Sequence, residues 1–269
     1  MIKYFMISTT LKNTFFENIQ NSSENFTKHF HNSYAISITN KGFFKSISQG
    51  KIGHSYVYSL RVINPYEVHE GISKEWSFTT FYPTIELMEE VYKDIFFEKK
   101  IPLFQEQIYN DKILYKLFFG FFQSVFLKKD NLLIETNAIR ALSYLIKHYS
   151  CNAEKEISFD RPNSLKRALE YICDNLDKNI TLDELSLVAS LSKYHFLRLF
   201  KEHYGITPHK YILTQRVNRA KMLIKKEKNL SIIASKSGFC DQSHFIKSFK
   251  KIYGYTPSNI LESSNILQY

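Results

Sequence analysis

Two stretches near the C-terminal end of this chain repeat one pattern at a distance of 49 residues. The first is SKYHFLRLFKEHYGITP, from Ser192 to Pro208, and the second is SHFIKSFKKIYGYTP, from Ser243 to Pro257. Each reads as an amphipathic helix followed by a glycine that can stop it and by a Thr-Pro pair. The C-terminal part therefore contains one helical unit written twice.

A shorter helix and a tight turn precede each copy. Thr181 and Glu184 have the spacing of a capping box, so a helix is expected over TLDELSLVAS, and Ser192 caps the next one. In the second copy, a short helix beginning at Leu230 leads to a glycine turn, and Asp241 caps the helix after it. Both units read as helix, turn, helix.

A long helix is predicted between the two units, from about Pro208 to Lys226. At 1.5 Å per residue it would be roughly 28 Å long. That length can hold the second helices of the two units roughly 34 Å apart, which is one turn of B-DNA. The pattern favours two helices that read successive major grooves, and a duplicated all-helical scaffold is the alternative.

The faces of the repeated helices separate these explanations. Phe196, Phe200, Phe245 and Phe249 suit a buried core, which both explanations need. The opposite faces carry side chains that hydrogen-bond base edges or pair with phosphates. They are Lys193, Tyr194, Arg198 and Lys201 in the first copy and Gln242, Ser243, Lys247 and Lys250 in the second.

The distribution of charge points the same way. The chain has a formal net charge of +10, and residues 163–269 hold 17 Lys and Arg against nine Asp and Glu. A concentrated cationic region is typical of a protein that binds a polyanion, nucleic acid before a membrane surface. Solubility alone also produces such an asymmetry.

No segment of the sequence suggests a membrane or an oxidising compartment. No window approaches the roughly 18 unbroken apolar residues of a spanning helix, and the start MIKYFMISTTLKN has no extended apolar run. The three cysteines lack metal-type spacing and are typical of reduced thiols. We expect a cytoplasmic protein without a membrane partner.

The first 160 residues follow another pattern. Short segments such as YAISITN and SYVYSLRVI, separated by glycine and proline, are typical of a β-sandwich or barrel. From Thr84 onward three helices are predicted, over ELMEEVYKDIFFEKK, NDKILYKLFFGFFQSVFLKK and NLLIETNAIRALSYLIKHYS. The apolar surface of the second helix, which includes Ile113, Leu117 and Phe121, packs on the barrel alone or also on a second subunit.

Three histidines stand out in the strand-rich region: His29, His31 and His69. On their own they are compatible with a metal site, with polar groups lining a pocket, or with surface positions. The residue types alone do not choose among these.

The C-terminal stretches LDELSLVASLSKYHFLRLFKEHYGITPHKYI and GFCDQSHFIKSFKKIYGYTPSNI resemble the AraC/XylS family of bacterial transcription regulators, over roughly residues 163–262. The resemblance implies two helix-turn-helix units joined by a long helix, which bind asymmetric promoter sites and help RNA polymerase to start transcription. It implies base-facing positions at Tyr194, Leu197 and Arg198 in the first recognition helix and at Gln242, Ser243, His244 and Lys247 in the second.

Two residues depart from the family pattern. Leu197 is apolar where a polar side chain often reads a base, so its contact would be a thymine methyl or none. Ser190 stands at the usual turn glycine, which costs little if its φ is not positive.

The segments HFHNSYAISITNKG, INPYEVHEG and WSFTTFYP resemble the cupin-like sensor domain of many AraC-type regulators. The metal-binding cupin pattern has a Glu where this chain has Ala35, so neither a metal nor another cofactor is expected. The resemblance implies a pocket for a small polar metabolite. Its lining would be His29, His31, Tyr34, Glu67, His69 and Trp76.

We therefore expect an α+β protein with a cupin-like β-barrel over 1–85, a helical dimerisation segment over 86–149, a linker over 150–162 and an AraC-type DNA-binding domain over 163–269. The predicted function is that of a homodimeric transcription regulator, of the activator type usual in the family, which binds promoter DNA and responds to a small-molecule effector. No catalytic residues are assigned. The alternatives are a metal-dependent cupin enzyme with an accessory helical domain and a regulator of the same family that senses a fatty acid.

Overall fold

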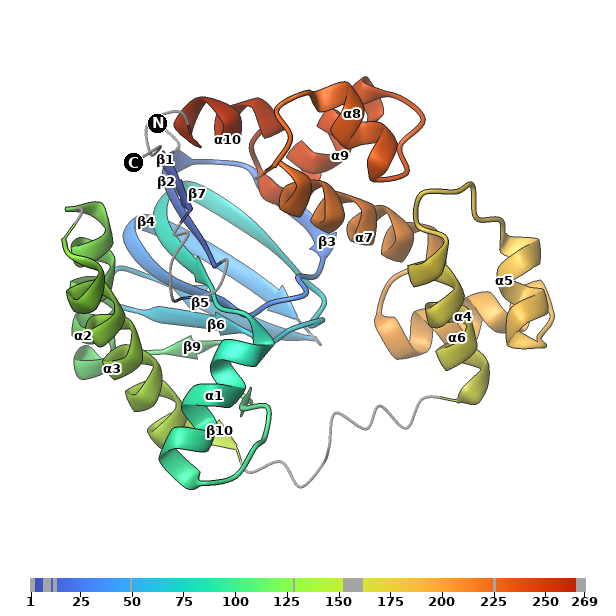
Figure 1. Cartoon of the computed structure of the whole chain (residues 1–269). Helices are drawn as coiled ribbons and strands as arrows, with labels where there is room; N and C mark the ends of the chain where they lie inside the picture. The colour runs from blue at the N-terminus through green and yellow to red at the C-terminus, as the bar shows by residue number, and fades with distance from the viewer. Residues whose placement is uncertain are drawn as a thin grey trace.

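The structure, a computed structural model, describes residues 3–6, 11, 14–48, 50–127, 129–151, 162–224 and 226–264. An antiparallel sheet occupies the N-terminal part, and three helices follow it along the chain. The helices of residues 208–264 lie across the opposite side of the sheet, and those of residues 163–204 lie to one side of it (Figure 1). This confirms the predicted α+β organisation.

The main sheet has eight strands in the order β1-β2-β7-β4-β6-β9, with β3 also paired to β7 and β5 also paired to β4. Among the described residues no pairing joins β1 to β9, so the cupin-like barrel is an open, curved sheet. The bounds are β1 (Lys3–Met6), β2 (Phe15–Ser22), β3 (Asn25–His29), β4 (Ala35–Ser48), β5 (Lys51–Ser55), β6 (Leu60–Ile63), β7 (His69–Tyr82) and β9 (Ile108–Tyr109).

The two longest strands, β4 and β7, give the sheet its curvature. They pair along most of their length, with register shifts between Thr39 and Phe43. Gly42 lies within this irregularity at a φ of 76°, and a Cβ there would collide with the carbonyl oxygen of Glu75. Only glycine fits such a bulge, which bends the strand and sharpens its twist.

Alternate residues of the strands face opposite sides of the sheet. Phe16 and Phe81 face one core, which they share with α1 (Ile85–Phe96), α2 (Lys112–Phe126) and α3 (Asn131–Tyr149). These helices confirm the three that were predicted. Phe15 and Phe78 face the other way, into a second core that also contains side chains of the C-terminal helices.

Three short strands lie outside the predicted barrel of residues 1–85. Two of them, β8 (Leu103–Phe104) and β9, separate α1 from α2, and β10 (Ser150–Cys151) pairs with β8. The predicted linker therefore begins with a paired strand, and its residues 152–161 lie outside the described part of the chain.

The C-terminal part consists of α4 (Asn163–Asp174), α5 (Leu182–Ala189), α6 (Lys193–Tyr204), α7 (Pro208–Leu223), α8 (Leu230–Lys236), α9 (Gln242–Tyr253) and α10 (Pro257–Ser264). The two helix-turn-helix units are α5–α6 and α8–α9, as the sequence predicts. The connecting helix α7 has 16 residues, so it is roughly 24 Å long and shorter than expected. Helix α10 was not predicted.

The local signals at the helix ends are confirmed. Thr181 and Glu184 form a capping box, and the side chains of Ser192 and Asp241 accept hydrogen bonds from the first turns of α6 and α9. Both recognition helices end on a left-handed glycine, at a φ of 68° in the first and 78° in the second. Equivalent N-cap residues and C-terminal glycines therefore give α6 and α9 the same length.

Ser190 is the exception among these signals. Its φ is 55° and its ψ is 43°, so the condition under which a non-glycine residue would cost little there is not met. A left-handed conformation costs an L-residue about 1–2 kcal/mol. The turn of the first unit is consequently strained at one position.

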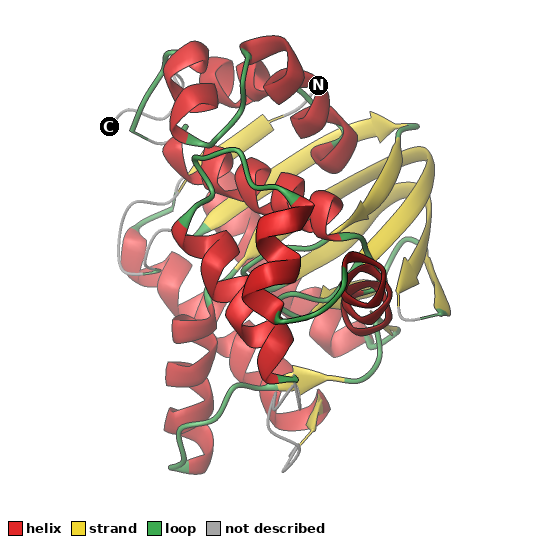
Figure 2. Cartoon of the chain, turned by 90° about the vertical axis from the view of Figure 1, so that its right-hand side faces the viewer, coloured by secondary structure: helices red, strands yellow, loops and turns green. Residues whose placement is uncertain are grey.

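The C-terminal helices lie against the sheet domain (Figure 2). Helix α9 packs beside β3, and α10 lies beside β1. Phe30 and Val68 from the sheet domain join the core of the first helix-turn-helix unit. No helix in the described ranges is both long and apolar enough to cross a bilayer.

Candidate functional site

The two recognition helices, α6 and α9, turn the predicted DNA-reading residues to solvent. Their phenylalanines are fully buried at equivalent positions, which fixes the opposite face of each helix outward. Tyr194 is 77% exposed, whereas Leu197 is 37% exposed because it lies nearer the core. The other predicted residues are all exposed: Lys193, Arg198, Lys201, Gln242, Ser243, His244, Lys247 and Lys250.

Some of these side chains have partners within the protein. Lys193 pairs with Asp183, and Arg198 lies 3.5 Å from Glu202, measured from Nε to Oε1. Exposed pairs of this kind contribute about 0–1 kcal/mol. DNA phosphates and base edges can therefore replace these partners at little cost.

Lys250 differs from the rest because its partner belongs to the sheet domain. Its Nζ lies 3.7 Å from Oε1 of Glu24, which follows β2. Close by, the Thr27 hydroxyl donates to the main-chain carbonyl of Lys251 over 3.2 Å. The C-terminal half of the second recognition helix is thus attached to β3.

A small cavity of about 40 Å³ lies between the inner face of the sheet and α9. It brings together His29, His31, His69 and Trp76 of the predicted pocket. Trp76 stacks on neighbouring aromatic rings and donates its indole N–H to Thr39 over 3.1 Å. The ring of Trp76 is therefore used in packing. Of these four residues, the three histidines are the ones whose ring nitrogens can bind a ligand.

Tyr34 and Glu67 do not line this cavity. Tyr34 packs into the core beneath the helices, where its hydroxyl donates to the carbonyl of Pro102 over 2.7 Å. The carboxylate of Glu67 accepts hydrogen bonds from Ser48, Asn64 and Gln107. Both are occupied by structural contacts, so the predicted pocket is reduced to four of its six residues.

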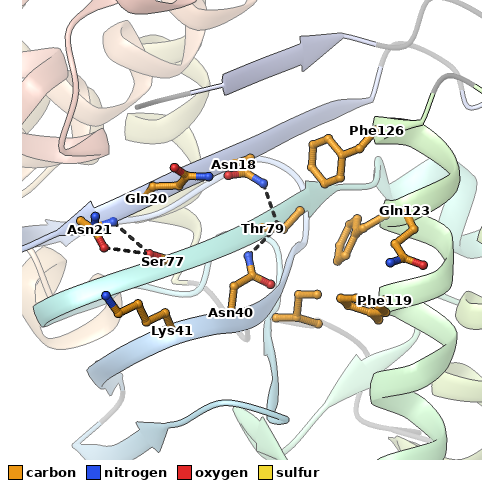
Figure 3. A pocket seen from close by; sticks show the side chains of 12 residues that line it. Asn18, Gln20, Asn21, Asn40, Lys41, Ser77, Thr79, Phe119, Gln123 and Phe126 are labelled. Atoms are coloured by element: carbon orange, nitrogen blue, oxygen red, sulfur yellow. Dashed lines mark hydrogen bonds between the residues drawn. The ribbon is translucent and has the colours of Figure 1, made fainter.

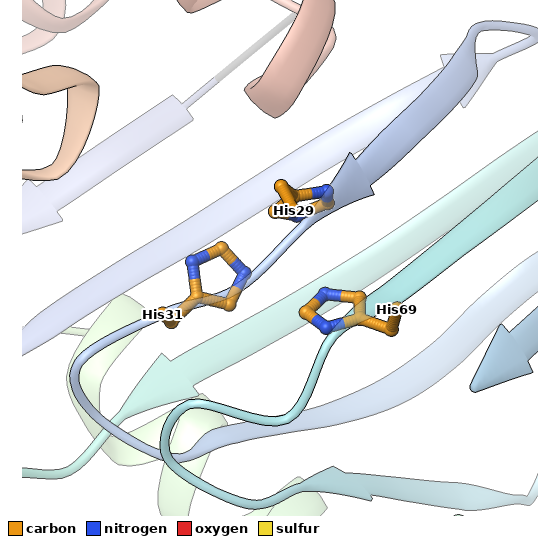
Figure 4. A group of neighbouring side chains, drawn as sticks. All are labelled: His29, His31 and His69. Carbon is orange, nitrogen blue, oxygen red and sulfur yellow. The ribbon is translucent and has the colours of Figure 1, made fainter. Parts of the chain in front are cut away.

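The three imidazoles of the cavity are turned toward one another (Figure 4). Their ring centroids lie 4.3 to 5.1 Å apart. A carbonyl can only accept, so His29 Nδ1 donates to Thr27 O over 2.7 Å and His69 Nδ1 donates to Glu67 O over 2.9 Å. In a neutral ring this leaves the Nε2 lone pair of both residues available.

Burial keeps these histidines neutral. It lowers the pKa of His29 to about 3, mainly through desolvation. Desolvation likewise lowers the pKa of His31 and His69 well below the usual value, and the neighbouring histidines add to the effect. The cavity therefore presents imidazoles in the form that binds metals or accepts hydrogen bonds.

Arg61 also lines the cavity and was not predicted. It is 6% exposed, and its Nε is buried without a hydrogen-bond partner among the described residues. Burial lowers the pKa of Arg61 to about 10, so the guanidinium stays charged at neutral pH. The sequence signal was a lone arginine inside the apolar strand LRVI.

An ion pair between the two parts of the chain lies beside the cavity. Lys221 of α7 donates to Glu17 of β2 over 2.7 Å, and both side chains are buried. The hydroxyls of Tyr82 and Tyr255 also donate to the Glu17 carboxylate. The Lys221 ammonium lies 4.0 Å from the ring centre of Tyr253, which lines the cavity.

A larger groove of about 560 Å³ lies between the other side of the sheet and α2 (Figure 3). Asn18 and Asn40 donate to the Thr79 hydroxyl on its sheet side, over 3.4 and 2.9 Å. Phe119 and Phe126 line its helical side. This groove was not predicted, because its polar and aromatic residues come from segments far apart in the sequence.

Comparison with known proteins agrees with this arrangement. A family model described as a helix-turn-helix domain matches residues 185–263. The uncharacterized HTH-type transcriptional regulator YbfI of Bacillus subtilis is 28% identical over 228 residues, which cover 82% of this chain and 81% of YbfI. The XylDLEGF operon transcriptional activator of Pseudomonas putida is 32% identical over 75 residues, which cover 28% of this chain and 23% of that protein.

Among solved structures, a ligand-free point variant of ToxT from Vibrio cholerae superposes with a TM-score of 0.65 at 14% sequence identity. The match covers 95% of this chain and 98% of that one. ToxT bound to an unsaturated fatty acid gives a TM-score of 0.57 at 14% identity, covering 97% of this chain and 94% of that chain. The whole two-part fold is therefore shared.

A curved sheet joined to two helix-turn-helix units defines a DNA-binding transcription regulator. The matched helix-turn-helix model and these relatives agree with the resemblance of the chain to the AraC/XylS family of such regulators.

Proposed function

We propose that this regulator reads two successive major grooves of promoter DNA with α6 and α9, under the control of a small effector in the sheet domain. The observation that carries the proposal is the equivalence of the two helices. They share their caps, their buried phenylalanines and their exposed basic or polar faces. Arg198 and Lys247 are the side chains we assign to base edges.

Binding to the upstream DNA of the protein's own gene and to a scrambled duplex, at several salt concentrations, tests the reading step. In Arg198→Ala/Lys247→Ala, preference for the real sequence is expected to fall, because a good base contact contributes about 1–3 kcal/mol of discrimination. The matched control is Lys93→Ala/Arg140→Ala, which removes the same charge from exposed positions on α1 and α3. Equal losses in both double variants would show that the basic domain holds DNA without reading it.

We place the effector in the histidine cavity, because a molecule there touches the sheet and α9 together. Its binding would shift the population between arrangements in which α9 is attached to β3 and arrangements in which α9 is free. The Lys250–Glu24 and Lys221–Glu17 pairs are the contacts that such a shift would break.

The fatty-acid alternative has a separate basis. ToxT binds an unsaturated fatty acid. The cavity of about 40 Å³ in this chain is too small for an acyl chain, since about 10–15 Å³ of such space is needed to hold a single water. The groove of about 560 Å³ has the volume of a small-molecule site and aromatic side chains on one wall. Native mass spectrometry of the purified protein would reveal a retained fatty acid, and loss of that species in Phe119→Ala would assign it to the groove.

We further propose that the regulator acts as a homodimer in the cytoplasm and contacts RNA polymerase at the promoter, and we assign it no catalytic reaction. Helices α2 and α3 expose large apolar side chains, with Ile113 57%, Leu127 65% and Leu132 74% exposed. Such a surface suits a second copy of the chain. Sedimentation equilibrium of wild type and Leu132→Glu tests this, and a monomeric wild type would rule it out.

A further inference from the structure

We propose that His29, His31 and His69 bind one divalent transition-metal ion of the zinc class at the contact between the sheet and α9. The inference rests on the proposed function in one respect: it names the effector of the regulator as a metal ion. The binding site itself stands on the geometry of the three imidazoles.

Backbone pairing brings two of the ligands together. His29 ends β3 and His69 begins β7, and the two residues are direct partners in the β3–β7 register. His31 follows two residues after His29, and one nitrogen from each ring lies within 4.8 Å of the others. Tetrahedral zinc with Zn–N bonds of about 2.0–2.1 Å requires nitrogens roughly 3.3 Å apart. The rings must therefore move closer together to bind the ion, and we expect His31 to turn, because the main-chain carbonyls of Thr27 and Glu67 hold the other two rings.

The second layer of contacts suits metal ligands. The main-chain carbonyls of Thr27 and Glu67 hold the Nδ1–H of His29 and His69, which fixes the tautomer and directs Nε2 into the cavity. Within the described part of the chain, no hydrogen bond reaches Nε2 of either residue or any ring nitrogen of His31.

Three neutral imidazoles form a sufficient set for zinc, which leaves a fourth position for water or an anion. Ala35 lines the cavity where the metal-binding cupin pattern has Glu. Its presence removes an anionic ligand, but the three-histidine set remains intact.

The charges around the site determine which kind of fourth ligand the metal ion would take. Glu17 and Arg61 both line the cavity, but Glu17 is already paired with Lys221, so the positive charge of Arg61 beside the site is not offset. The unpartnered Nε of Arg61 can donate to an anion that occupies the open metal position. The geometry thus suits a dication with a small anionic ligand better than a bare dication.

The metal site is in contact with the second recognition helix. Tyr253, the last residue of α9, stacks on His31 with ring centroids 5.6 Å apart and an interplanar angle of 19°. When His31 turns to bind the metal, this stacking changes, and α9 is expected to move with it. Metal occupancy would in this way alter DNA binding.

Metal titration of the full chain, treated with a chelator beforehand, tests the site without DNA. One Zn²⁺ per chain is expected by native mass spectrometry, and bound Co²⁺ should show the visible absorption of four-coordinate cobalt. His69→Gln should lower Zn²⁺ affinity at least about 100-fold, since even indirect ligand contacts contribute 10–100-fold. His148→Ala, an exposed histidine on α3, is the control that keeps wild-type affinity.

A gain-of-function variant keeps the test valid if a histidine variant misfolds. Ala35→Glu adds a carboxylate to the cavity and should raise Zn²⁺ affinity at least about tenfold. It should also increase the rise in Tm that Zn²⁺ produces. No binding by wild type, or equal binding by wild type and a variant with all three histidines changed to Gln, would overturn the metal site. Because this titration contains no DNA, its failure is distinct from failure of the DNA-reading proposal.

Discussion

Lys221 of α7 and Glu17 of β2 form a buried ion pair that joins the DNA-binding helices to the sheet domain. The side chains are 6% and 3% exposed, and the atoms Nζ and Oε1 lie 2.7 Å apart. The two residues are 204 positions apart in the sequence. A buried pair of this kind is costly to break on one side, because the remaining charge loses its compensation.

Removal of one partner is therefore expected to destabilise the protein. Glu17→Gln should lower the free energy of unfolding by about 3–5 kcal/mol. The double variant Glu17→Gln/Lys221→Met should recover part of that loss, because no isolated charge remains. Urea denaturation measures both. The control Glu202→Gln breaks the exposed pair with Arg198 and should cost under about 1 kcal/mol, so a similar loss in both single variants would contradict the prediction.

The ion pair between Lys250 and Glu24 leads to a prediction about DNA affinity. Glu24→Gln frees Lys250 from the sheet domain and should raise DNA affinity by up to about fivefold, since exposed pairs contribute at most about 1 kcal/mol. Fluorescence anisotropy with labelled promoter DNA measures the change. Glu106→Gln, which removes an exposed partner of Lys51 far from the recognition helices, should leave the affinity unchanged. Identical gains in both variants would indicate a general charge effect.

Ser190 gives a test of backbone strain. Ser190→Gly should stabilise the protein by about 1 kcal/mol, because glycine adopts a φ of 55° without a steric penalty. Ser190→Ala is the matched control, since it removes the hydroxyl that accepts from Arg167 but keeps the strained backbone. In thermal unfolding, the Tm of Ser190→Gly should lie above that of wild type, and the Tm of Ser190→Ala should lie at or below it. Melting temperatures of both variants below that of wild type would mean that the hydroxyl outweighs the strain.

Asp111 supplies a pH-dependent contribution at the start of α2. Partial burial raises its pKa, but hydrogen bonds from the Tyr149 hydroxyl, two main-chain N–H groups and the Tyr144 hydroxyl together hold the pKa of Asp111 below its usual range. Its folded-state pKa is thus lower than the unfolded one. The stabilisation is present above the unfolded pKa and is lost as the pH falls through the folded one.

Asp111→Asn should therefore cost stability at pH 7, by about 1 kcal/mol for a weakened N-cap and tyrosine contacts. The difference from wild type should shrink as the pH falls through the folded-state pKa of Asp111, below which both side chains are neutral. Urea denaturation at a series of pH values measures this. A difference that does not change with pH would exclude the carboxylate as its source.

Local signals explain why the recognition helices were predicted accurately. Ser192 and Gly205 fix both ends of α6, and Asp241 and Gly254 do the same for α9. A cap acts within a few residues, so its effect can be read from the sequence without knowledge of the fold. Helix α10 begins three residues after Gly254 and was missed, although Pro257 at its start was visible.

The cavity was harder to predict because it depends on long-range packing. The three histidines were identified as a group, but Tyr34 was assigned to the wrong side of the sheet. Neighbouring residues of a strand face opposite sides, so a one-residue difference decides which core a side chain joins. Arg61 and Lys221 were missed because their roles arise only when α7 and β6 meet beside the same space.

The second core, which combines Phe15 and Phe78 of the sheet with Ile252 and Tyr253 of α9, has a consequence for truncated forms of the chain. A fragment that begins at α4 would expose the apolar face that these helices present to the sheet. Such a fragment should aggregate more readily than the complete chain. The reciprocal fragment, ending at α3, would leave the inner face of the sheet uncovered. Each half is thus expected to stay soluble mainly when it packs against the other half. The two halves should therefore fold as one cooperative unit.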